Sequence, residues 1–150
     1  GWYYEMIELG FNYRLPDLAC SLGLSQLKRA PQGIARRREI ASLYNQAFQN
    51  TPIEIIKPSE DVGHAYHLYV IQVENRKALY QDLRKQGIYS QIHYIPVNTL
   101  PYYKKFGYQK MPVAEAYYKR CLSLPMYPSL TEEKQKLIIE QTMREFEVLC

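Results

Sequence analysis

The sequence predicts an α/β domain, and three observations support that prediction. The chain has 150 residues, of which 47% are hydrophobic, so it can bury one substantial core. Residues 66–73 and 88–95 are strongly β-prone and flank a helical pattern at 76–86. Amphipathic helical patterns occur towards both ends of the chain. Because a strand, a helix and a second strand follow one another, we expect a compact α/β unit.

Two helices are expected near the amino-terminal end. Pro16 suits the first turn of a helix that runs to about residue 29. Pro31 and Gly33 are expected to end it, since both residues oppose helix continuation. A second helix is expected from Ile34 to Phe48, with its arginines largely on the side opposite the apolar residues. The basic cluster at residues 36–38 therefore indicates a solvated helix face.

The next part of the chain supplies the expected sheet. Asn75 is a suitable cap for the helix at 76–86, whose Leu79 and Leu83 should face inward, and Gly87 should end it. Three β-prone stretches are expected to be extended, and the second of them should be the central strand. These stretches are 53–57, 66–73 and 88–95.

Shorter elements are expected towards the carboxyl terminus. Pro112 should open one helix, and Thr131 should cap the closing helix, whose capping box is incomplete. The expected elements are a short helix at 101–106, a helix at 113–121, an extended segment at 122–124 and a closing helix from 131 to about 149. We place the only domain boundary near Asn50, between helical residues 1–50 and a sheet-containing domain at 51–150.

Charge and cysteine usage exclude several functional classes. The 19 basic and 15 acidic residues are interspersed, and a net charge of +4 gives no indication of nucleic-acid binding. The three cysteines, Cys20, Cys121 and Cys150, form neither a zinc pattern nor a disulfide framework, which favours a reducing cytoplasm. No apolar run approaches the roughly 20 residues needed to span a bilayer, so we expect no membrane partner.

Asn12 and Arg14 form a polar pair just ahead of the first helix. The amide of Asn12 and the guanidinium of Arg14 both suit an anionic oxygen, such as that of a phosphate or carboxylate. A helix cap and a loop-bracing ion pair are the structural alternative for these two residues. His64 and His67 are three residues apart, but no third ligand is near, so polar packing is favoured over a metal site.

Gln91, Ile92, His93 and Tyr94 form a polar and aromatic cluster at the end of an expected strand. Ligand-binding groups are common where strands meet irregular loops, although structural burial also explains a histidine here. The residues alone leave both alternatives open.

Several separated blocks resemble the DegT/DnrJ/EryC1/StrS family of pyridoxal-phosphate sugar aminotransferases, and they cover essentially the whole chain. The blocks are LGFNYRLPDLACSLGLSQLKR, HAYHLYVIQV, GIYSQIHYIPV, LPYYKKFGY and PVAEAYYKRCLSLPMYPSLT. Within the family, the stretch WYYEMIELGFNYRLPDLACSLGLSQLK and the block GIYSQIHYIPV are most similar to transaminases of pseudaminic acid biosynthesis. The resemblance implies the carboxyl-terminal α+β small domain of a fold-type I enzyme, with helices on a small, mainly antiparallel sheet. Residues 1–50 would then connect it to the large domain.

The resemblance also implies an activity and a set of site residues. The implied reaction transfers an amino group, usually from glutamate, to the 4-keto carbon of a UDP-4-keto-6-deoxy-N-acetylhexosamine. Asn12 would bind the cofactor phosphate of the other subunit in a homodimer, and residues 91–94 would border the sugar-nucleotide site. The role of Arg14 stays open between substrate binding and loop bracing.

Two departures from the family pattern matter. The Schiff-base lysine lies in a motif upstream of the asparagine loop in this family, so we expect it before Gly1 and assign no catalytic residue. Lys28 lacks the context of that motif. Asn98 stands where many relatives have histidine, which puts a substrate role there in doubt.

Two other functional classes remain open from the sequence. A binding or dimerisation module of the same fold would use these residues for packing and would cover the apolar side chains of Leu18 and Leu22. A fragment of a larger enzyme should expose them. A dehydratase relative acting on nucleotide sugars would differ at the missing lysine.

Overall fold

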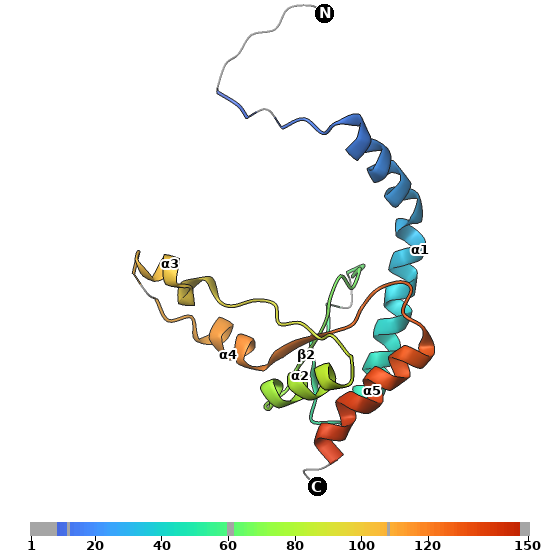
Figure 1. Ribbon diagram of the computed structural model, residues 1–150, viewed down its shortest axis with the longest axis vertical. Helices are drawn as coiled ribbons and strands as arrows, with labels where there is room; N and C mark the ends of the chain where they lie inside the picture. The colour runs from blue at the N-terminus through green and yellow to red at the C-terminus, as the bar shows by residue number, and fades with distance from the viewer. Residues whose placement is uncertain (1–8, 12, 60–61, 108, 148–150) are drawn as a thin grey trace, which may run out of the picture. The chain divides into compact units, whose positions relative to one another are not determined.

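The computed structural model describes residues 9–11, 13–59, 62–107 and 109–147. The chain forms two compact units, Gly1–Pro31 and Gln32–Cys150. Figure 1 shows the elements in chain order, coloured from blue at the start of α1 to red at α5. The division into a connecting part at 1–50 and a small domain at 51–150 stays a prediction.

The expected break between two amino-terminal helices is wrong. A single helix, α1 (Asp17–Phe48), continues through Pro31. Proline removes one backbone donor and costs about 3 kcal/mol in a helix interior, but the turns around it keep their other hydrogen bonds. In the second unit, α1 buries Ile40, Tyr44 and Phe48. Tertiary packing of this kind outweighs helix propensity, so the proline does not end the helix.

The sheet confirms the predicted fold class. In the described part of the chain, three strands pair in the order β1-β2-β3, namely β1 (Glu54–Ile55), β2 (Tyr69–Gln72) and β3 (Cys121–Leu124). Both pairings are antiparallel, and β2 is central, as predicted. Tyr69 and Ile71 of β2 are buried while the residues between and after them are half-buried, which gives the expected period of two. All four residues of β3 are buried.

The strand expected at residues 88–95 is wrong. This stretch makes one isolated antiparallel bridge, between Gln91 and Ser123. Ile88 and Ser90 are buried, whereas Tyr89 and Gln91 are exposed. The alternation that predicted a strand therefore reflects alternating burial without a continuous ladder of hydrogen bonds.

The remaining α-helices lie close to their expected positions, whereas the short 3-10 helix at Val97–Thr99 was not predicted. Gly87, with a φ of 74°, ends α2 as predicted, but Asn75 makes no side-chain cap bond. Thr131 does cap α5, because its Oγ1 accepts a hydrogen bond from the Lys134 amide at 3.3 Å. The helices are α2 (Arg76–Lys85), the 3-10 helix η1 (Val97–Thr99), α3 (Pro101–Lys104), α4 (Pro112–Arg120) and α5 (Glu132–Glu147). None of the helices in the described part of the chain combines the length and apolarity that a bilayer requires.

The core of the second unit lies between the sheet, α2, α5 and the later half of α1. Leu79 and Leu83 of α2 and Ile138 of α5 are buried in it. Gln135 of α5 donates to the carbonyl of Ile40 at 2.8 Å, so α5 packs beside α1 in this unit (Figure 1). Packing against α1, α2 and α5 therefore holds the sheet and the loops at its ends in place.

The basic cluster at residues 36–38 is not a solvated face, so that interpretation is wrong. Arg37 Nη1 donates to the carbonyls of Tyr66, His67 and Met126 at 3.1, 3.3 and 2.9 Å. Arg36 donates to a carbonyl of the loop before α5 at 3.0 Å, and Arg38 to a carbonyl of the loop before β2 at 3.0 Å. The three guanidinium groups tie α1 to two loops whose carbonyls lack partners in regular structure.

Two buried tyrosines make this unit less stable at alkaline pH. The rings of Tyr44 and Tyr69 lie 4.7 Å apart, and burial raises the pKa of both phenols, with a smaller contribution from neighbouring phenols. Tyr44 Oη donates to the carbonyl of Pro125 at 3.1 Å, and Tyr69 Oη donates to the side chain of Asn45 at 2.8 Å. Both phenols are therefore neutral donors in the folded chain.

The free energy of unfolding should fall as pH rises above about 10. Above that pH the unfolded chain releases phenolic protons that the folded chain still holds, so the stabilisation present at lower pH is lost. Urea denaturation at a series of alkaline pH values measures this fall. Tyr44→Phe should make the fall shallower, and an unchanged slope in that variant would contradict the assignment.

Candidate functional site

The segment Gln91–Tyr94 is fixed to β3 through two residues of that strand, Ser123 and Cys121. The amide of Gln91 donates to the carbonyl of Ser123 at 3.0 Å, and the amide of Ser123 donates to the carbonyl of Gln91 at 2.8 Å. His93 Nδ1 lies 2.9 Å from Ser123 Oγ. Cys121 Sγ, also on β3, is 3.8 Å from the carbonyl oxygen of His93. The segment is thus held by main-chain and side-chain contacts together.

The four side chains of this segment differ in burial. Ile92 packs against the core, whereas Gln91 and Tyr94 are exposed, Tyr94 to 73%. The ring of His93 is half-buried and meets the ring of Tyr94 edge to face, with centroids 4.6 Å apart. Ile92 anchors the segment, and the amide, imidazole and phenol around it are available to a ligand.

Asn98 has a structural role. Its Nδ2 donates to the carbonyl of Gln109 at 2.8 Å and to Oε1 of Glu115 at 3.1 Å. The side chain therefore links η1 to the start of α4 and to the loop before it. These bonds agree with the doubt about a substrate role at this position.

The other predicted site residues lie in the first unit. Asn12 lies outside the described residues. Arg14 is exposed and makes no hydrogen bond or ion pair with the described part of the chain, so its guanidinium is free to bind an anion. Of the two residues predicted to contact an anionic group, only Arg14 can therefore be placed, and its chemistry fits a phosphate.

The first unit also exposes a large apolar surface. Leu18 is 84% exposed and Leu22 is 61% exposed, as expected for a fragment of a larger enzyme. The other large apolar side chains of this surface are Leu9, Phe11, Tyr13, Leu15, Leu24 and Leu27, all exposed. An apolar surface of this kind is typical of a face that another segment or chain covers.

His64 shows polar packing, whereas His67 is exposed and, in the part of the chain that the structure describes, only its backbone carbonyl accepts a hydrogen bond. His64 Nδ1 accepts a hydrogen bond from the amide of Tyr66 at 3.2 Å, and its ring meets that of Tyr66 edge to face. The described residues contain no group of three His, Cys, Asp or Glu side chains that could hold a metal ion.

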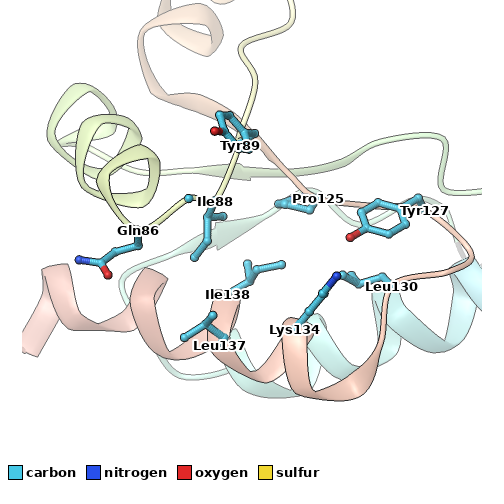
Figure 2. Close-up of a pocket in the computed structure, with 10 residues that line it drawn as sticks. Gln86, Ile88, Tyr89, Pro125, Tyr127, Leu130, Lys134, Leu137 and Ile138 are labelled. Carbon is cyan, nitrogen blue, oxygen red and sulfur yellow. The ribbon is translucent and has the colours of Figure 1, made fainter.

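A separate pocket of about 330 Å³ opens between α5, the end of α2 and the loop that follows β3 (Figure 2). Its walls are mostly apolar, and Lys134 is the single charged residue among those that line it. In Figure 2 the tip of Lys134 lies towards the phenol of Tyr127. The pocket can take an apolar group, but its lining offers no acid–base pair and contains none of the predicted site residues. We therefore keep the candidate site at Gln91–Tyr94.

Ser123 and Cys121 also contact the candidate site, although neither residue was predicted to do so. Burial raises the pKa of the Cys121 thiol, so it is a neutral group that packs under the segment. The signal for Ser123 was present, since it is the one polar residue in the apolar run 121–124. A buried hydroxyl in a strand requires a partner, and here the partner is His93.

The chain matches known proteins along most of its length. It is 43% identical over 151 residues to the spore coat polysaccharide biosynthesis protein SpsC of Bacillus subtilis, covering 93% of this chain and 39% of the relative. It is 35% identical over 144 residues to the UDP-4-amino-4,6-dideoxy-N-acetyl-beta-L-altrosamine transaminase of Campylobacter jejuni, covering 91% of this chain and 38% of the relative.

A solved structure shows the same fold. The PLP form of Spr1654 from Streptococcus pneumoniae superposes with a TM-score of 0.88 at 31% identity, covering 100% of this chain and 40% of that one. The chain thus spans about two fifths of the length of the proteins it matches. The model of the DegT/DnrJ/EryC1/StrS aminotransferase family matches residues 1–143, and the chain belongs to that family.

Proposed function

We propose that this chain is the carboxyl-terminal part of a pyridoxal-phosphate-dependent aminotransferase that acts on a nucleotide sugar. Membership of the family, the PLP form of a structural relative and the share of each relative that the chain covers all support this proposal. The exposed apolar surface of the first unit supports it further, because the rest of the enzyme would cover that surface.

The finer proposal concerns the reaction. An amino group passes, usually from glutamate, to the 4-keto carbon of a UDP-4-keto-6-deoxy-N-acetylhexosamine. The name of the Campylobacter jejuni relative, a transaminase of a UDP-4-amino sugar, supports this substrate class. The amino-acid sequence of the block GIYSQIHYIPV resembles transaminases of pseudaminic acid biosynthesis and supports a place in that pathway. Pyridoxal phosphate, when bound, supplies the electron sink that amino transfer requires.

The residues of this chain would bind the cofactor and the sugar nucleotide and orient them. Asn12 and Arg14 carry amide and guanidinium donors that suit a phosphate, Asn12 for the cofactor of the other subunit in a homodimer. Gln91, His93 and Tyr94 would contact the sugar nucleotide, and Ile92 would hold them in place through the core. The observation that carries the substrate assignment is the fixed segment on β3 with exposed Gln91 and Tyr94 beside a half-buried imidazole.

His93→Ala should lower kcat/KM by about tenfold, as expected when one hydrogen bond to a bound substrate is lost. The measurement uses the protein expressed from its complete reading frame, with pyridoxal phosphate, glutamate and the UDP-4-keto sugar. His67→Ala is the matched control, since His67 is exposed and lies outside the segment. The 150 residues alone should show no turnover. Equal kcat/KM in both variants would reject the substrate assignment, and turnover by the 150 residues alone would reject the proposal that they are an inactive part.

A further inference from the structure

Ser123 makes two kinds of contact with the Gln91–Tyr94 segment. Its main chain forms the bridge with Gln91, and its hydroxyl lies 2.9 Å from His93 Nδ1. Ser123 is 4% exposed, and Oγ has no second hydrogen-bond partner among the described residues. The main-chain bridge already holds the segment that contains His93 next to β3. The contribution of the hydroxyl contact can therefore be separated from that of the bridge.

The direction of the hydroxyl contact follows from hydrogen-bond satisfaction. If His93 Nδ1 carried the proton and donated, the buried serine hydroxyl would have no described acceptor for its own proton. A buried donor without an acceptor is unfavourable. The hydroxyl therefore donates, and Nδ1 accepts through its lone pair. A neutral imidazole whose Nδ1 is an acceptor carries its proton on Nε2.

We propose that Ser123 is a positioning residue that fixes neutral His93 as the Nε2–H tautomer. Nε2 makes no hydrogen bond with the part of the chain that the structure describes, so its N–H is available outside the segment. It would present a donor to an acceptor oxygen of the nucleotide sugar. This inference rests on the proposed function for its ligand, while the tautomer itself depends only on the contacts described above.

The tautomer is tested by ¹⁵N NMR of the histidine rings at a pH where they are neutral. His64 supplies an internal reference, because its Nδ1 accepts from a backbone amide and its proton must therefore be on Nε2. His93 should show the same pattern as His64. In Ser123→Ala, His93 should shift to a mixture of tautomers while His64 stays unchanged. Ser123→Thr keeps the hydroxyl and should preserve the pattern of the unsubstituted chain. A proton on Nδ1 of His93, or no change in Ser123→Ala, would overturn the inference.

The consequence for binding is tested with UDP-N-acetylglucosamine as the probe, by calorimetry on the protein from its complete reading frame. His93→Ala should weaken binding by about tenfold, and Ser123→Ala by about threefold, since the donor is then present only part of the time. Ser123→Thr should bind as the unsubstituted protein does.

The outcomes separate the two proposals. If His93→Ala binds the probe normally, the substrate assignment of the segment fails, and the NMR result still decides the role of Ser123. If His93→Ala weakens binding but Ser123→Ala does not, the positioning role is overturned while the proposed function stands.

Discussion

Leu122→Ala should lower the free energy of unfolding by about 3 kcal/mol, in the range known for a fully buried leucine in a core. Leu122 lies in β3 opposite Ile71, and both side chains are completely buried. Neighbouring side chains from the sheet and the helices surround it, so the cavity left by the substitution can collapse only in part. Urea denaturation measures the change.

Leu137→Ala is the matched control for this prediction. Leu137 lies on α5 and is 44% exposed, so the same truncation removes less buried area and should cost below about 1 kcal/mol. Similar losses in the two variants would show that β3 is not the centre of the core. If Leu122→Ala instead changes only the slope of the urea transition, the m value, then the substitution has altered the two-state character of unfolding.

The sequence predicted best those elements whose local pattern and tertiary burial agree. The helix at α2 was predicted because Leu79 and Leu83 share one face and both are buried. The central strand was predicted because β-branched and aromatic residues alternate around it, and the structure buries Tyr69 and Ile71 alternately. The boundaries were less accurate, since strand ends depend on which residues find a partner on the neighbouring strand.

The errors arose where a local pattern has more than one structural meaning. Residues 88–95 alternate in burial, and a strand was predicted, but among the described residues only Ser123 forms a bridge with this stretch. Pro31 predicted a helix end, although a proline inside a helix weakens it without necessarily ending it. In both places the outcome depends on long-range contacts that no window of sequence contains.

The candidate site could be predicted only in part for the same reason. The segment Gln91–Tyr94 was identified by a resemblance to a family, because its residue types alone also fit a structural role. Ser123 was not identified, since it is 30 residues from His93 in the sequence. A side-chain contact over that separation follows from the fold, in which β3 returns beside the segment. The sequence could indicate that the serine needs a partner, but not which one.

Arg37→Met should lower the free energy of unfolding by about 3 kcal/mol. Methionine keeps much of the length of the side chain but donates no hydrogen bonds, so the carbonyls of Tyr66, His67 and Met126 lose the donor they share. Nη1 has two protons, so its three contacts amount to at most two full hydrogen bonds. A hydrogen bond from a charged donor contributes roughly 1.5–3 kcal/mol, so a loss of about 3 kcal/mol is expected. Both loops would lose a bond to α1, while the bonds of Arg36 and Arg38 to the same loops would remain.

Arg38→Met, one residue along the same helix, is the matched control. Arg38 donates one hydrogen bond, to the exposed carbonyl of His64, which water can replace. Its loss should cost below about 1 kcal/mol by urea denaturation. If the two variants are equally stable, the three contacts of Arg37 do not hold the loops, and residues 36–38 act as the solvated face that their composition indicates. If Arg37→Met alone is destabilised, the basic cluster stabilises the connection between α1 and the sheet, because guanidinium groups can satisfy carbonyls that no strand or helix pairs.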